Sequence, residues 1–122
     1  MDQGIDPQTE RPDALPPAEV RFVEVHIEPW PDGRRVRVHI TLTPFQQPPN
    51  LAAVIFNEQD EELTSADIIE TIVDRLVFTL HIPSRQNGDH YKLTTELSYP
   101  ELGVTDRRSV PFKISENSPA DE

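Results

Sequence analysis

The sequence has 122 residues, a formal net charge of −11 and no cysteine. This length allows for one domain, and the acidic balance disfavours binding to nucleic acid or to an anionic membrane surface. The missing cysteine excludes disulfides, thiolate metal ligands and a cysteine nucleophile. No apolar run has the length of a membrane span. The N-terminal residues lack the basic and apolar regions of a signal peptide, so with Met1 as the native start we expect a cytoplasmic protein.

Both ends of the chain differ in composition from the middle. Residues 1–18 contain four prolines, four acidic residues and one basic residue, and residues 116–122 contain three acidic residues and no basic one. Such segments bury too little apolar surface to offset the entropy lost when a chain is ordered. We therefore expect disordered acidic tails at 1–18 and 116–122, and one folded domain at 19–115.

Alternating apolar and polar residues predict β-strands through most of the middle segment. The residues expected to face the core are Val23, Val25 and Ile27 in 19–28, Val36, Val38, Ile40 and Leu42 in 34–44, Leu76, Phe78, Leu80 and Ile82 in 75–83, Tyr91, Leu93, Thr95, Leu97 and Tyr99 in 90–99, and Val110, Phe112 and Ile114 in 107–115. Pro31, Asp32 and Gly33 separate the first two strands and are typical of a tight hairpin turn.

Two segments between these strands have other patterns. Residues 51–56 are almost all apolar, which predicts a strand covered on both faces. Residues 65–76 carry apolar side chains at helical spacing after Ser65, a residue suited to a helix N-cap. Their many β-branched residues favour an extended chain instead. We predict a strand at 62–70 and a turn at 71–74, with a short helix as the alternative.

Six or seven short strands within one domain, with turn signals between them, predict an antiparallel β-sandwich. Tyr91 lies where the chain leaves the turn at Asn87 and Gly88 and enters a strand. This pattern resembles the tyrosine corner of immunoglobulin-like and fibronectin type III-like domains. It is also similar to small uncharacterised β-sandwich proteins of bacteria.

The resemblance implies an immunoglobulin-like β-sandwich without a disulfide. Tyr91 would be its structural corner, with its hydroxyl bonded to backbone in 83–87, and Leu93 would occupy the position of the second cysteine of an immunoglobulin domain. An ordinary half-buried strand tyrosine is the alternative for Tyr91. The chain departs from the family pattern in lacking the cysteine pair and a tryptophan on the third strand. Arg85 also stands where fibronectin type III domains often have a leucine.

Histidines and acidic residues are the candidates for a metal site. In this topology His26, His39 and His81 lie on neighbouring strands and could share an exposed face that holds zinc. The alternative is three solvated histidines, and we predict no metal and no cofactor. The acidic residues in 58–62 lack the spacing of an EF-hand and predict a charged hairpin end. The pairs Arg34–Arg35 and Arg107–Arg108 are interpreted as charges that flank strands, with an anion site as the alternative.

The sequence contains neither a Gly-x-Ser-x-Gly motif nor a phosphate-binding glycine loop, so we do not expect an enzyme. Trp30 lies between two prolines at a hairpin tip, Phe45 opens a proline-rich loop, and both, with Tyr99, are candidates for a binding surface. We expect a non-catalytic protein-interaction or accessory module whose partner is an unidentified protein and whose oligomeric state is open. The alternative is a carbohydrate-binding module that uses exposed aromatics. A flat, exposed Trp30 indole would favour sugar binding, and a covered indole would favour the interaction module.

Overall fold

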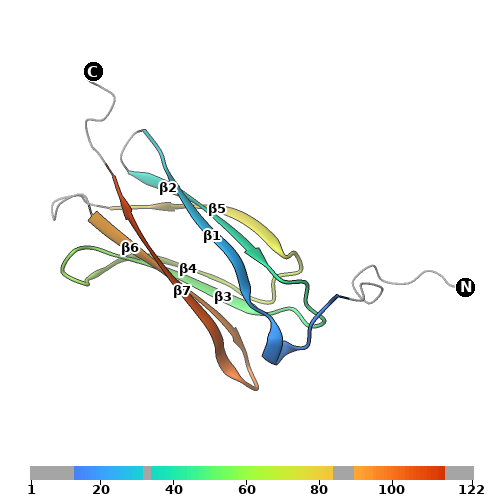
Figure 1. The fold of residues 1–122 in the computed structure, drawn as a ribbon. Helices are drawn as coiled ribbons and strands as arrows, with labels where there is room; N and C mark the ends of the chain where they lie inside the picture. Colours follow the sequence, from blue (N-terminus) through green and yellow to red (C-terminus); the bar gives the residue numbers. More distant parts are fainter. Residues whose placement is uncertain (1–12, 32–33, 84–89, 115–122) are drawn as a thin grey trace, which may run out of the picture.

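Two antiparallel β-sheets pack face to face in a computed structural model that describes residues 13–31, 34–83 and 90–114 (Figure 1). The strands are β1 (Phe22–Pro29), β2 (Arg35–Leu42), β3 (Asn50–Phe56), β4 (Glu62–Ile68), β5 (Arg75–His81), β6 (His90–Tyr99) and β7 (Gly103–Lys113). One sheet has the order β1-β2-β5 and the other the order β4-β3-β6-β7. The predicted all-β, immunoglobulin-like sandwich is therefore confirmed.

The central strands β2 and β6 follow the predicted alternation of inward and outward side chains. All the residues predicted to point inward on these two strands are buried, which places them in the single core between the sheets. The inward residues of β5 and β7 also contact this core, although Leu76, Phe78, Val110 and Phe112 are only half-buried. The alternation predicts these faces because successive side chains of a strand point to opposite sides of its sheet.

A β-bulge changes the predicted face of one residue in β1. Phe22 pairs with Leu42 and Glu24 pairs with Thr41, so Val23 is an extra residue without a partner on β2. Phe22 is buried whereas Val23 is 57% exposed. The prediction that Val23 faces the core is wrong, because a bulge inserts one residue and shifts the alternation on one side of it.

The segment 50–74 corrects one prediction and confirms another. In β3, Leu51, Ala53 and Ile55 are buried while the residues between them are half-exposed, so this strand is covered on one face and not on both. The predicted strand at 62–70 is observed as β4, and residues 69–74 form an irregular connection rather than a helix. β4 pairs with β3 and not with β5, which makes the second sheet four-stranded.

Residues 13–18, which the sequence analysis assigned to the N-terminal tail, contact the sandwich. The Leu15 N–H donates to the Pro44 carbonyl at 3.0 Å, and Ala14 is buried. The 3-10 helix η1 (Pro17–Glu19) follows and leads into β1. The rest of that expected tail, 1–12, and the expected C-terminal tail, 116–122, lie outside the described residues. No helix in the described part of the chain is long and apolar enough to cross a membrane.

Side chains of β7 join the two sheets at the edge of β1. The Phe22 N–H donates to Asp106 Oδ2 at 2.9 Å, and Arg108 Nη2 donates to the Phe22 carbonyl at 2.7 Å. Both backbone groups of Phe22 therefore have partners beside the bulge, where the strand ladder is interrupted. Arg108 was interpreted from the sequence as a charge that flanks a strand, but it lies within β7 and makes this structural contact. Its neighbour Arg107 forms an ion pair with Glu96 at 2.6 Å.

Candidate functional site

Tyr91 is buried at the start of β6, with 4% of its surface exposed. Its ring stacks on Phe112 of β7, with 5.5 Å between the ring centroids. The alternative of a half-buried tyrosine is therefore wrong for the ring. The expected hydroxyl bond to 83–87 and the position of Arg85 fall mainly on residues outside the described part of the chain.

Two of the three aromatic residues proposed for a binding surface are buried. Phe45 is 2% exposed and Tyr99 is 1% exposed, so neither ring can stack on a ligand. The Tyr99 hydroxyl donates to the Gln47 carbonyl at 2.9 Å. Burial raises the pKa of Tyr99 from its ordinary value of 10.0 to about 12, because the charged phenolate loses its hydration. Tyr99 has the same parity as Leu97 in β6, so the alternation itself already indicated an inward position.

Trp30 is half-buried after β1 and is covered by two arginines of β2. The guanidinium carbon of Arg35 lies 4.2 Å from the centroid of the indole ring, and that of Arg37 lies 5.1 Å away. Cations over an aromatic face are attracted by the negative charge of the π system. The indole is therefore capped and does not form a flat exposed platform, which is the observation expected for the interaction module.

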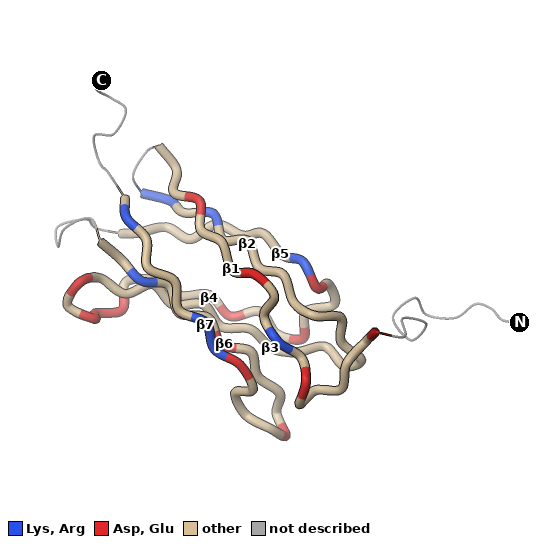
Figure 2. The backbone as a smooth tube through the Cα atoms, viewed as in Figure 1, with Lys and Arg blue, Asp and Glu red and all other residues tan. Residues whose placement is uncertain are grey.

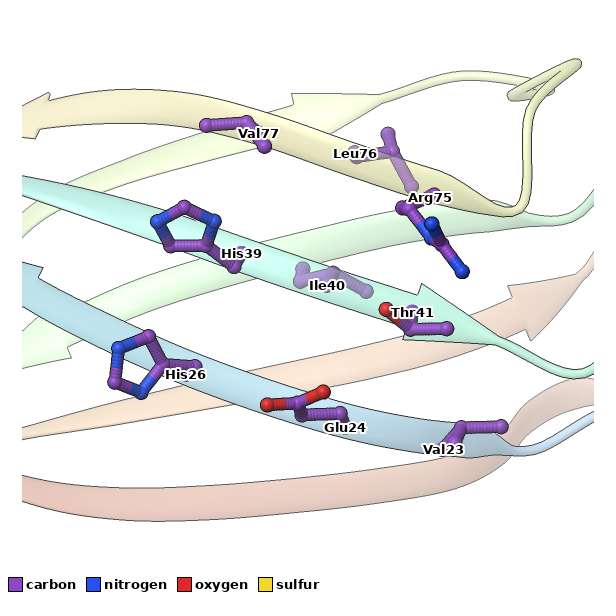
Figure 3. A pocket seen from close by; sticks show the side chains of 9 residues that line it. All are labelled: Val23, Glu24, His26, His39, Ile40, Thr41, Arg75, Leu76 and Val77. Atoms are coloured by element: carbon purple, nitrogen blue, oxygen red, sulfur yellow. The ribbon is translucent and has the colours of Figure 1, made fainter.

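The outer face of the β1-β2-β5 sheet brings together two of the three candidate histidines (Figure 3). His26 and His39 are direct cross-strand partners with ring centroids 5.5 Å apart, and His39 Nε2 lies 3.1 Å from Glu28 Oε1. His81 pairs with Arg35, whereas His39 pairs with Val77, so His81 lies further along the sheet. The described residues contain no group of three or more His, Cys, Asp or Glu that could hold a metal ion.

The acidic residues 58–62 lie at the hairpin between β3 and β4, as predicted (Figure 2). The buried side chain of Asn57 organises this turn. Its Oδ1 accepts hydrogen bonds from the N–H groups of Gln59 and Glu61, both at 2.9 Å, and its Nδ2 donates to Glu61 Oε1 at 2.9 Å. Asp60 has a positive φ of 63°, which short polar residues accept more readily than most. The hairpin therefore presents its carboxylates on a tightly bonded turn.

A shallow groove crosses the outer face of the three-stranded sheet (Figure 3). One row across it contains His26, His39 and Val77, and the next contains Glu24, Thr41 and Arg75. The groove combines apolar walls with both signs of charge. It ends at β5, the last strand of this sheet.

The side chains that sequence reasoning missed are aliphatic residues on β5 and on the connection that precedes it. Four of them are strongly exposed: Ile69 (70%), Ile72 (75%), Val73 (49%) and Val77 (56%). We call these four residues the β5 surface. The sequence signal was the high density of Ile and Val in 68–77. That density was interpreted only as a preference for strand over helix, and not as a sign of an exposed apolar surface. Four large aliphatic side chains exposed within the short segment 69–77 make this segment the candidate binding surface.

No protein-family model and no curated protein sequence matches this chain. Solved structures with a similar fold include the β-glucuronidase of Bifidobacterium dentium, with a TM-score of 0.57 and 10% identity over 80% of this chain. A β-glucuronidase of Ruminococcus gnavus has a TM-score of 0.52 and 11% identity over 79% of this chain. A glycosyl hydrolase family 2 member of Bacteroides cellulosilyticus has a TM-score of 0.53 and 14% identity over 78% of it.

The matched segments are small parts of those enzymes. This chain covers 18%, 16% and 15% of the three structures respectively, which is less than one fifth of each. At these identities the likeness concerns the fold alone. The chain therefore has the β-sandwich fold of one segment found within larger glycosidase chains.

Proposed function

We propose that this protein is a non-catalytic accessory module that binds another protein through the β5 surface. The observation that carries the proposal is the exposure of Ile69, Ile72, Val73 and Val77 on one strand and its preceding connection. Burying a large aliphatic side chain contributes about 1.5–3 kcal/mol, so covering several of them supplies a strong driving force for association.

The connection that carries three of these residues is anchored on the domain. The Thr71 N–H donates to the Pro49 carbonyl at 3.0 Å, and the Leu42 N–H donates to the Asp74 carbonyl at 2.8 Å. Thr71 is buried, and its hydroxyl bonds both backbone groups of Val73. A surface that is ordered before binding loses less conformational entropy when the partner docks. This anchoring supports recognition by preformed side chains.

The carbohydrate-binding alternative has weaker support. Sugar recognition by a sandwich of this kind would use exposed aromatic rings, but Phe45 and Tyr99 are buried and Trp30 is covered by Arg35 and Arg37. The similar glycosidases do not change this assessment, because the match covers less than one fifth of each. The partial match supports an accessory role, since in those structures a sandwich of this fold is a minor part of a longer chain.

Affinity purification from the source organism with quantitative mass spectrometry tests the proposal. Val73→Asp places a charge on the β5 surface, and Val104→Asp is the matched control because Val104 is 48% exposed on β7 and Val73 is 49% exposed. We expect Val73→Asp to weaken binding of the captured partner by about tenfold or more, the effect of losing a moderate hot spot. Val104→Asp should leave binding unchanged. Equal capture by both variants would refute the assignment of the surface.

A further inference from the structure

β5 is an edge strand whose backbone presents hydrogen-bonding groups to the outside. Paired residues of antiparallel strands alternate between those that exchange hydrogen bonds and those that do not. The Leu42 N–H bonds the Asp74 carbonyl, and the Ile82 N–H bonds the Arg34 carbonyl, which fixes the alternation between β2 and β5. Leu76, Phe78 and Leu80 therefore direct their backbone groups to β2. The backbone groups of Arg75, Val77 and Thr79 point to the outer edge, which no strand of the described chain covers.

The other three edges of the two sheets formed by the described strands carry features that hinder the addition of a strand. β1 has a bulge at Val23, and the backbone groups of Phe22 are occupied by side chains of β7. β7 contains Pro111 and has a register shift opposite Leu97 and Ser98. β4 has a register shift and charged residues, Glu62 and Asp67. Prolines, bulges and charges are the means by which natural sheets protect their edges.

β5 has none of these features in its central part. Residues 76–80 read LVFTL, without charge or proline, and the pairing with β2 runs without a register shift. The inward side chains of Leu76 and Phe78 are only half-buried, so apolar surface remains uncovered between this edge and the opposite sheet. Val77 is 56% exposed on the outer face. An added strand would bond the edge and cover apolar groups on both faces.

We propose that the partner supplies an extended segment that pairs with the outer edge of β5 as an additional strand. This proposal rests on the proposed function and names the mode of recognition. The segment would carry apolar residues beside Leu76 and Phe78, a β-branched residue opposite Val77 and an acidic residue opposite Arg75. Arg75 is exposed and makes no ion pair within the described residues, so its charge is available to a carboxylate.

A second copy of this chain is the less suitable occupant. Two copies paired through β5 would bring together chains that each have a formal net charge of −11, and this repulsion opposes self-association. An antiparallel β5 pair would also place Arg75 opposite a basic or neutral residue of β5 rather than a carboxylate. Charge complementarity therefore favours a segment of a different protein.

The test uses the full chain labelled with nitrogen-15 and a synthetic eight-residue peptide in which valine alternates with threonine and one position is glutamate. Amide hydrogen exchange is measured with and without peptide. We expect the Val77 and Thr79 amides to gain about fivefold or more protection, the effect of one new backbone hydrogen bond each. The Leu76 and Phe78 amides should change less, because they already bond β2. No gain at Val77 and Thr79 with saturating peptide would overturn the proposal.

Two matched controls separate strand pairing from apolar adhesion. Methylation of the peptide nitrogens that face β5 should abolish binding, whereas methylation of the nitrogens on the other side should not, since the side chains are unchanged. Val77→Lys should weaken peptide binding by about tenfold, and Val23→Lys should not, although the two valines are 56% and 57% exposed. Equal weakening by both lysines would indicate docking across the groove and would overturn strand addition.

Further outcomes distinguish failure of this proposal from failure of the proposed function. If a cellular partner depends on Val73 but binds normally to the Val77→Lys and Val77→Pro variants, the interaction module stands and strand addition is refuted. If no partner depends on Val73, the proposed function itself fails. Light scattering of the free protein measures whether it forms a dimer. A stable dimer that Val77→Lys disrupts would identify a second copy as the occupant and refute a different partner.

Discussion

Replacement of Tyr99 by phenylalanine provides a test of how deeply this side chain is buried. Tyr99 is 1% exposed and donates its hydroxyl to the Gln47 carbonyl at 2.9 Å. Tyr99→Phe keeps the ring and removes this bond, so at neutral pH we expect it to lower the free energy of unfolding by about 0.5–1.5 kcal/mol. The magnitude would approach the upper end if the Gln47 carbonyl found no water to replace the hydroxyl.

The same substitution should have the opposite effect at high pH. Burial raises the pKa of Tyr99 from 10.0 to about 12. A group with a raised pKa in the folded state contributes its full stabilisation below the unfolded pKa, and the protein loses it as the pH rises through the folded pKa. Two pKa units correspond to about 2.7 kcal/mol, lost between about pH 10 and pH 12. The phenylalanine variant lacks this loss, so it should become the more stable protein near pH 12.

Urea denaturation of both proteins from pH 7 to pH 12, followed by circular dichroism, measures this difference. Because Tyr91, the lysines and the arginines are present in both proteins, the difference between their unfolding free energies isolates Tyr99. We expect that difference to change sign above pH 10. A difference that stays constant over this range would refute the desolvation of the hydroxyl and hence the buried position of Tyr99.

Three further substitutions test the core, the turn and the contact between the sheets. Leu93→Ala should lower the free energy of unfolding in urea by about 2–5 kcal/mol, because Leu93 is fully buried. Lys92→Ala at the neighbouring exposed position should lower it by less than about 0.5 kcal/mol, and the reverse order would show that the register of β6 is wrong. Asn57→Ala should lower the free energy of unfolding by about 1–3 kcal/mol, because three hydrogen bonds of the β3–β4 hairpin are lost. An unchanged midpoint temperature of thermal unfolding would contradict this role. Asp106→Ala should lower the free energy of unfolding by about 1.5–3 kcal/mol, because the Phe22 N–H loses a charged acceptor. Hydrogen exchange of the Phe22 amide should become faster, and an unchanged exchange rate would exclude the bond.

The candidate site was only partly predictable. The sequence indicated that Trp30 is the residue whose exposure separates two functions, and it placed His26 and His39 on neighbouring strands. It could not show that Arg35 and Arg37 cover the indole, since that contact depends on the rotamers of long side chains. It also could not show that β5 is an unprotected edge. An edge is defined by which strand is absent beside it, and a local pattern contains no information on strand order.

The sequence by itself determined the all-β class, the inward faces of β2, β5, β6 and β7, and the charged hairpin at 58–62. These features follow from local rules, because the period of two is a property of each strand and turn residues act within a few positions. Tertiary structure decided the exposure of Val23, since a bulge is a mismatch between two strands. It also decided the partner of β4 and the burial of Phe45, which depend on how distant segments pack. The β5 surface belongs to this second group: its residues are ordinary strand formers in the sequence. Only the packing of the described strands leaves Val77 exposed on the edge strand β5 and the other three residues exposed on the connection that precedes it.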